Sequence, residues 1–183
     1  MDGQIILDND SFHKTYLIQI IVMRVRFQNS HKEVMRMNTE ELRENFLCKA
    51  LMQDNKVQLG YSHYDRVIIG GLKPVADVLE LPNHSELKAE YFLQRREAGL
   101  INVGGKGEVI TDENTFILNK LDCLYLGKET KAVTFKSHDE SNPALFYILS
   151  APAHRKYPCA KMTREEASPV SLGDRAASNK RTI

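Results

Sequence analysis

The sequence has few cysteines, no long hydrophobic run and no excess of charge of one sign. Its three cysteines, Cys48, Cys123 and Cys159, form no C-x-x-C pair, so the spacing indicates neither a disulfide framework nor a zinc knuckle. The apolar stretch 16–23 is much shorter than the ~20 residues that span a bilayer. Acidic residues precede it where a signal peptide would have basic ones. We therefore expect a cytoplasmic protein with no membrane partner.

The charges are balanced along the chain. There are 25 basic and 24 acidic side chains, which give a net charge of +1, and they form no long blocks. Proteins that bind nucleic acid usually carry a clustered basic face, so the sequence predicts no nucleic-acid partner. Its 183 residues, 42% of them apolar, are enough for one hydrophobic core of ordinary size.

A glycine-rich stretch, Ile101–Val109 (INVGGKGEV), raises the question of whether the chain binds a phosphate group. A phosphate loop needs a strand, the glycines and then a helix whose N-terminus faces the anion. Here two short apolar runs follow, separated by the polar residues Asp112–Asn114. We interpret the glycines as a turn between strands, where a positive φ and a close approach of the backbone favour glycine.

The periodicity of apolar residues changes along the chain. Asn38 stands three residues before Glu41, which is the spacing of a capping box, and we predict a short helix over 39–47. Beyond it, short apolar runs with a period of two alternate with Gly, Asn, Asp and Lys turns, as in an antiparallel sandwich or barrel. No run is long enough for the crossover helix of a parallel sheet.

Residues 105–127 carry a spaced pattern of glycines, aspartates and apolar pairs that resembles the centre of the cupin superfamily. The resemblance implies an all-β fold: a cupin-like antiparallel β-barrel (jelly roll) with a short N-terminal helical arm. Metal-bearing cupins have a His-x-His pair and a glutamate just before this region and a histidine after it. This sequence has no His-x-His pair, and no histidine in 89–97 or 128–133. We therefore expect no metal ligands on this chain.

Two histidines and an arginine are candidate catalytic residues. His63 stands two residues before Asp65, which could hold its imidazole in one tautomer as a base; alternatively, it is hydrogen-bonded or solvated at a strand edge. His154 could polarise a carbonyl group, or it could pack in a loop between two prolines. Together with Arg66, these histidines would be the residues of a metal-independent catalysis.

Arg95 and Arg96 are candidate substrate-binding residues, because a guanidinium fork matches the carboxylate of a sugar acid. The alternative is a salt bridge with Glu97 at the surface or at a subunit interface. We expect the other histidines, which have polar neighbours, to be exposed: His13, His31, His84 and His138.

Eight motifs follow one another along the chain: YSHYDRVIIGG (61–71), YFLQRREAG (91–99), INVGGKG (101–107), LYLGK (124–128), APAH (151–154), SPV (168–170), LGD (172–174) and SNKRTI (178–183). Together they resemble the 5-keto-4-deoxyuronate isomerase family. The resemblance implies an isomerase of pectin degradation that interconverts 5-dehydro-4-deoxy-D-glucuronate and 3-deoxy-D-glycero-2,5-hexodiulosonate. It also implies two cupin barrels in tandem, a homo-oligomer (a hexamer for the full-length family) and one zinc ion per chain.

The family's zinc ligands lie in its second barrel, and no position of this sequence matches them. We therefore expect an N-terminal half that is inactive alone. Residues 1–22 form an extension without family counterpart, which we interpret as upstream mistranslation before Met23. The other expected segments are an arm with a short helix (23–55), the barrel (56–160) and a linker toward an absent second barrel (161–183). The alternative function is a non-catalytic barrel for assembly or sugar-acid binding.

Overall fold

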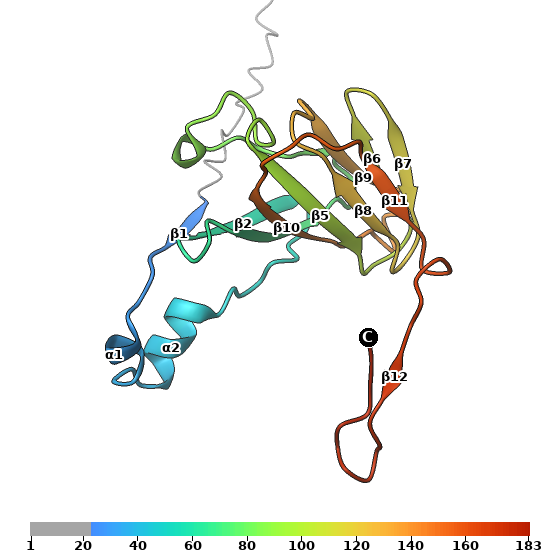
Figure 1. Cartoon of the computed structure of the whole chain (residues 1–183). Helices are drawn as coiled ribbons and strands as arrows, with labels where there is room; N and C mark the ends of the chain where they lie inside the picture. The colour runs from blue at the N-terminus through green and yellow to red at the C-terminus, as the bar shows by residue number, and fades with distance from the viewer. Residues whose placement is uncertain (1–22) are drawn as a thin grey trace, which may run out of the picture.

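A computed structural model describes residues 23–183 as a largely β structure (Figure 1). Expectations about residues 1–22, including His13, lie outside the described residues. In chain order the elements are β1 Arg24–Arg26, α1 His31–Val34, α2 Thr39–Phe46, β2 Lys56–Ser62, β3 Ile68–Lys73, β4 Leu79–Glu80, the 3₁₀ turn η1 Ser85–Leu87, β5 Arg96–Asn102, β6 Gly107–Thr111, β7 Thr115–Leu118, β8 Cys123–Leu126, β9 Val133–Ser137, β10 Phe146–Pro152, β11 Ala160–Met162, β12 Ser171–Leu172 and β13 Arg181–Thr182.

The strands form two main sheets that face each other. One has seven strands in the order β1-β2-β3-β10-β5-β8-β11, and the other has four in the order β4-β9-β6-β7. Every pair in them is antiparallel except β1 and β2. Two packed antiparallel sheets with non-sequential neighbours make a jelly roll. The predicted cupin-like antiparallel fold is confirmed.

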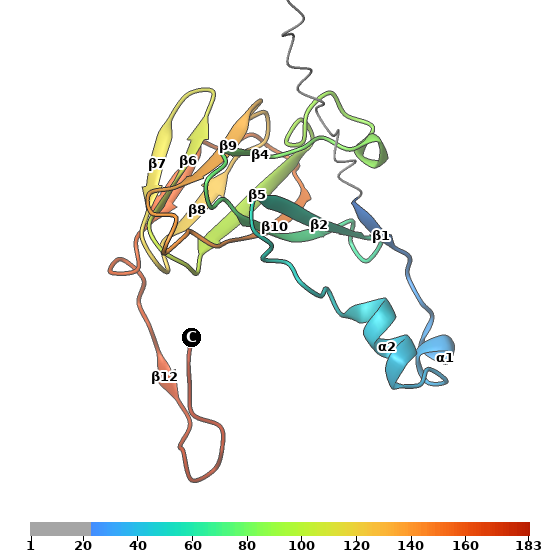
Figure 2. The same ribbon diagram turned by 180° about the vertical axis from the view of Figure 1, so that it is seen from behind.

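A helical arm and a short hairpin extend from the barrel. The predicted helix over 39–47 is α2, and its capping box is present: the Asn38 side chain accepts from the Glu41 N–H, and the Glu41 carboxylate accepts from the Asn38 N–H. Both views show the arm and the β12–β13 hairpin on the same side of the barrel (Figures 1 and 2). No helix in residues 23–183 is long and apolar enough to cross a membrane.

The core lies between the two sheets and follows from the period of two. Along β5, alternate residues are buried, and β10 behaves in the same way. The rings of Phe135 and Phe146 meet at the centre, with centroids 5.4 Å apart. The inward positions of β5 are apolar in the middle but polar at each end, with Arg96 at one end and Asn102 at the other. This change of polarity places a buried cation at one end of the barrel.

The glycine-rich stretch forms the corner between β5 and β6, as predicted, and no helix follows it. The expected reason was partly wrong, because Gly104 and Gly105 do not have a positive φ; among the described glycines Gly173 does. Glycine is needed for close approach instead. A Cβ on Gly105 would overlap the backbone carbonyl oxygen of Asn142. The buried Asn102 amide closes the corner by donating to the Gly105 carbonyl at 2.7 Å.

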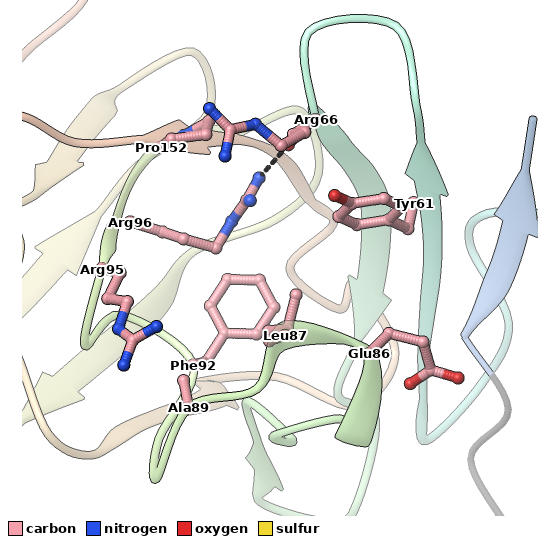
Figure 3. Close-up of a pocket in the computed structure, with 9 residues that line it drawn as sticks. All are labelled: Tyr61, Arg66, Glu86, Leu87, Ala89, Phe92, Arg95, Arg96 and Pro152. Carbon is pink, nitrogen blue, oxygen red and sulfur yellow. Dashed lines mark hydrogen bonds between the residues drawn. The ribbon is translucent and has the colours of Figure 1, made fainter. Parts of the chain in front are cut away.

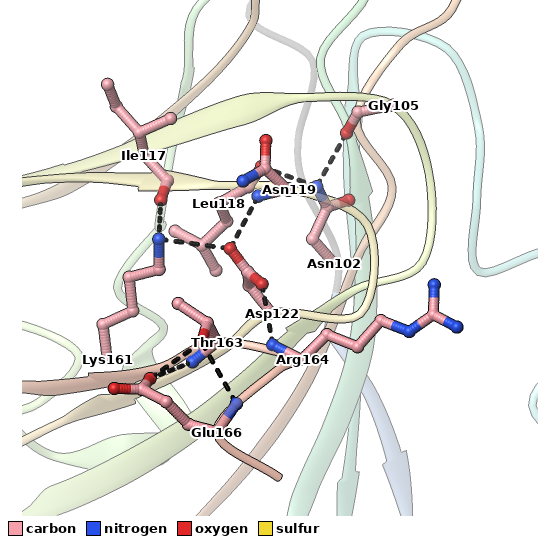
Figure 4. A network of polar contacts seen from close by, with 10 residues as sticks. All are labelled: Asn102, Gly105, Ile117, Leu118, Asn119, Asp122, Lys161, Thr163, Arg164 and Glu166. Atoms are coloured by element: carbon pink, nitrogen blue, oxygen red, sulfur yellow. Dashed lines mark hydrogen bonds and ion pairs between the residues drawn. The ribbon is translucent and has the colours of Figure 1, made fainter.

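At the same end of the barrel, a buried carboxylate ties the C-terminal segment to the sheets (Figure 4). Asp122 is only 1% exposed. Its oxygens accept from the backbone N–H of Asn119 at 2.9 Å, the backbone N–H of Arg164 at 3.0 Å and the Lys161 ammonium at 3.1 Å. Burial alone would raise the pKa of Asp122, but these donors outweigh burial and lower it.

A substitution at the barrel corner tests the close-approach explanation. We expect Gly105→Ala to lower the free energy of unfolding by about 1–3 kcal/mol, because the added methyl meets backbone that cannot move aside. Chemical denaturation measures it. Gly99→Ala is the matched control: a Cβ at Gly99 has nothing within 4 Å, so its effect should stay within about 0.5 kcal/mol. Equal losses in the two variants would refute the explanation.

The Asp122 network predicts a pH-dependent contribution to stability. We expect Asp122→Asn to lower the free energy of unfolding at neutral pH by about 2 kcal/mol, because three donors lose a charged acceptor. The pKa is depressed in the folded state, so this stabilisation is complete above the unfolded value of about 4 and is lost as the pH falls through the lower folded value. Acid should therefore destabilise the variant less than the wild type.

Denaturation curves across an acidic pH series, fitted for both proteins, measure this difference. Asp77→Asn is the control, because Asp77 is exposed and only its backbone N–H is held, by Asn55. That variant should keep the wild-type pH dependence. A wild-type acid response in Asp122→Asn would show that this carboxylate contributes nothing.

Candidate functional site

A cavity of about 150 Å³ opens at the end of the barrel where β2, β5 and β10 meet the segment around η1 (Figure 3). Three arginines line it, together with an acidic residue and two aromatic rings: Arg66, Arg95, Arg96, Glu86, Tyr61 and Phe92. The lining thus carries more positive than negative charge, which suits an anionic ligand.

Arg96 is the buried centre of this cavity. It is the first residue of β5, it points inward, and it is only 6% exposed. Its Nε donates to the Ser150 hydroxyl at 3.1 Å, and Nη2 donates to the carbonyls of Ser150 at 2.8 Å and Arg66 at 2.6 Å. Its Nη1 donates to none of the described residues, and no carboxylate in residues 23–183 pairs with it.

A buried cation without a counter-ion is costly, because the protein interior solvates charge poorly. The pKa of Arg96 is lowered to about 10, chiefly by burial; Tyr61 opposes this shift, and the positive charge of Arg66 contributes to it. Arg96 is still protonated at neutral pH. The barrel therefore presents a fixed positive charge that has one free donor and lacks an acidic partner among the described residues.

The β2–β3 hairpin supplies part of the cage around Arg96. Asp65 and Arg66 both have positive φ, of 52° and 54°, which is the backbone of a type I′ turn. The turn closes through the Val67 N–H, which donates to the Tyr64 carbonyl at 3.3 Å, and the Ser62 N–H donates to the Val67 carbonyl at 2.8 Å beside it. A left-handed conformation is unfavourable for a residue with a Cβ. Here it places the Arg66 carbonyl where the Arg96 guanidinium can donate to it.

Tyr61 lines both this cavity and a second one beside it. The Arg96 guanidinium carbon lies 6.0 Å from the Tyr61 ring centroid, within the range of a cation–π contact. Against the same ring, His63 packs edge-on at 5.2 Å, and Phe27 stacks on His63 at 4.8 Å. The second, more open cavity has a volume of about 480 Å³ and shares Tyr61 and Glu86 with the first.

The structure brings some of the predicted site residues together and separates others. Arg66, Arg95 and Arg96 line one cavity; Arg96 is buried, whereas the other two are exposed. The alternative, a salt bridge between this pair and Glu97, is not seen in the described residues, since the Glu97 carboxylate accepts from the Tyr125 hydroxyl at 2.8 Å. Arg95 and Arg96 are neighbours in the sequence, and the fold brings Arg66 into the same cavity.

The two candidate catalytic histidines do not line the arginine cavity. His63 lines the second cavity, is exposed, and makes no hydrogen bond to Asp65 among the described residues; its backbone N–H donates to the Arg26 carbonyl at 2.9 Å. His154 is exposed in the loop after β10. The described geometry therefore forms no base-and-acid pair around the free donor of Arg96.

Sequence reasoning missed three contributors to the site and misjudged another histidine. Tyr61, Phe92 and Ser150 were not singled out, although Ser150 follows Phe146 and Ile148 at inward positions of β10. A polar residue that continues an inward apolar series was the available signal. His84 was expected to be exposed, which is wrong.

His84 is 8% exposed, and its Nε2 meets no hydrogen-bond partner in the described residues. Burial lowers its pKa, against the opposing charge of Glu86. The histidine is the N-cap residue of η1 but makes no side-chain hydrogen bond to it. Its polar sequence neighbours gave no sign of that burial.

The chemistry open to this site is anion binding. Among residues 23–183, no group of three or more His, Cys, Asp or Glu side chains could hold a metal ion. The arginine cavity offers guanidinium donors and an aromatic wall, which match a carboxylate attached to a partly apolar body.

Comparison with known proteins places the chain in a family. A family profile described as KduI/IolB matches residues 46–183. The chain is 47% identical over 161 residues to the 4-deoxy-L-threo-5-hexosulose-uronate ketol-isomerase of Halalkalibacterium halodurans, covering 88% of this chain and 58% of that protein. It is 46% identical over 158 residues to the same-named protein of Formosa agariphila, covering 86% and 56%.

Among solved structures, an IolB-like protein from Salmonella typhimurium LT2 aligns with a TM-score of 0.49 and 19% identity, over 63% of this chain and 42% of that one. The chain spans somewhat more than half the length of the curated relatives it matches. The family match and the sequence identities confirm the resemblance seen in the motifs: this chain belongs to the KduI/IolB family.

Proposed function

We propose that the chain serves a ketol-isomerase of uronate catabolism, an intramolecular oxidoreductase that interconverts 5-dehydro-4-deoxy-D-glucuronate and 3-deoxy-D-glycero-2,5-hexodiulosonate in pectin degradation in the cytoplasm. The observation that carries the proposal is the 47% identity to a protein named as this ketol-isomerase. Because the match covers 58% of that protein, the activity is proposed for a chain of the relatives' length, in which this barrel is the N-terminal part.

The proposed reaction sets two chemical requirements. A proton must move between neighbouring carbons, and the negative charge of the enediolate must be stabilised. Zinc would supply that stabilisation in the full-length family when bound. The described residues do not fit a zinc site, since no His-x-His pair or ligand cluster is present in them. We therefore propose that this chain carries out no catalytic step by itself and serves in binding and assembly.

The second candidate function is a non-catalytic barrel that binds sugar acids or assembles with other barrels. The unpaired Arg96 charge favours the binding role. The assembly role fits the outer face of the seven-stranded sheet, where Leu149 is 48% exposed and pairs in register with the open Gly99. We propose a homo-oligomer, a hexamer for chains of the relatives' length.

If zinc binding and catalysis belong to the part of the relatives that this chain does not cover, the chain alone should lack both. We expect the 183-residue chain to bind no stoichiometric zinc and to have no substantial isomerase activity, because it lacks a ligand cluster among its described residues. A protein extended to the relatives' length should show both. Metal analysis by mass spectrometry and a coupled turnover assay measure them. Robust turnover by the 183-residue chain would contradict this assignment.

A further inference from the structure

We propose that the Arg96 cavity is a metal-independent binding site for the carboxylate of a sugar acid, whose ring extends past Tyr61 toward the Phe27–His63 pair. The choice of a sugar acid rests on the proposed function. The carboxylate site rests on Arg96 itself, so the two can fail separately.

Arg96 offers a ligand one nitrogen, Nη1, that makes no hydrogen bond to the described residues. Arg96 keeps Nη1 available while Nε and Nη2 are held by Ser150 and the Arg66 carbonyl. The guanidinium is thus fixed before a ligand arrives, which reduces the entropy lost on binding. A carboxylate at Nη1 would supply the missing counter-charge in a poorly solvated place, where a charge-assisted hydrogen bond is strong.

The charged side chains around Arg96 Nη1 are mostly positive. Arg66 and Arg95 lie at the exposed rim, and neither makes an ion pair within residues 23–183. Glu86 is the acidic member of the lining and lies across the cavity from Arg95 (Figure 3). The rim arginines attract an anion into the cavity, and Glu86 sits where it could accept a hydrogen bond from a hydroxyl group.

Beyond Tyr61, Phe27 and His63 form an aromatic shelf in the second cavity. Phe27 is 72% exposed and stacks with His63, so the pair offers an aromatic face at the edge of the second cavity. Ser85, Glu86 and Lys88 also line that cavity. An aromatic face beside hydroxyl, carboxylate and ammonium groups suits a sugar ring, which has apolar C–H faces and polar hydroxyls.

The N–H groups of a guanidinium donate to a carboxylate and also to phosphate. Because Nη1 alone is free in a cavity of about 150 Å³, we expect the smaller, planar group to be favoured. D-galacturonate is therefore the test ligand. Galactose lacks its carboxylate, acetate lacks its ring, and inorganic phosphate lacks both.

Nuclear magnetic resonance titration of the 183-residue chain tests the proposal. We expect D-galacturonate to shift the Arg96 side-chain Nε–H signal and the Tyr61 and Phe27 ring signals, with a dissociation constant in the micromolar to millimolar range. Chelator should not change the binding. Acetate should bind at least about tenfold more weakly and leave the Phe27 signals unmoved, and galactose should not move the Arg96 signal.

Variants separate the buried arginine from the rim. Arg96→Gln should weaken galacturonate binding about ten- to hundredfold, which is the loss expected for a hydrogen bond to a charged group. Arg96→Lys should recover only part of it, because an ammonium keeps the charge but loses the hydrogen bonds to Ser150 and the Arg66 carbonyl that fix the guanidinium. Arg95→Gln should weaken binding only a few-fold and in a salt-dependent way. Arg43→Gln, on the exposed side of α2, is the control and should bind like wild type.

Four results would overturn the proposal: no galacturonate binding by wild type, unchanged binding by a folded Arg96→Gln variant, equal affinity for galactose, or equal affinity for phosphate. If Arg96→Gln fails to fold, the wild-type titration decides. If acetate bound as tightly as galacturonate, the proposed contact between the sugar ring and the Phe27–His63 pair would be refuted. Isomerase activity is read separately, so binding without turnover in the longer protein would refute the proposed function and leave this site standing.

Discussion

The architecture of one end of the barrel depends on the buried guanidinium of Arg96. The alternation of β5 turns this side chain inward, where it is only 6% exposed and its charge is poorly solvated. Ser150 from β10 and the Arg66 carbonyl, held by a left-handed turn, satisfy three of its hydrogen bonds. The surroundings keep the charge in place without neutralising it. That imbalance is the basis on which we propose that this end of the barrel binds an anion.

Asp122 provides the opposite case within the same barrel. It is more deeply buried than Arg96, but the Lys161 ammonium and two backbone N–H groups surround it, so its charge is satisfied within the fold. Such a network stabilises a structure and leaves nothing for a ligand. Both charges are buried but they differ in their partners, and on this difference we base a structural role for Asp122 and the proposed binding role for Arg96.

Much of the fold could be predicted from the sequence. The Asn38–Glu41 capping box and the period-two runs are local signals, and they gave α2 and the antiparallel sheets. The candidate arginines were found, but not which one is buried, because that depends on where β5 begins. The burial of His84 and the close approach at Gly105 arise from distant segments folding together. Neither leaves a local signal.

A crystal structure of the protein soaked with D-galacturonate tests the central claim most directly. We expect the ligand carboxylate within about 3 Å of Arg96 Nη1, with the sugar ring past Tyr61 and against the Phe27–His63 pair. A carboxylate bound away from Arg96, or a cavity left empty while the sugar acid binds elsewhere on the barrel, would contradict it.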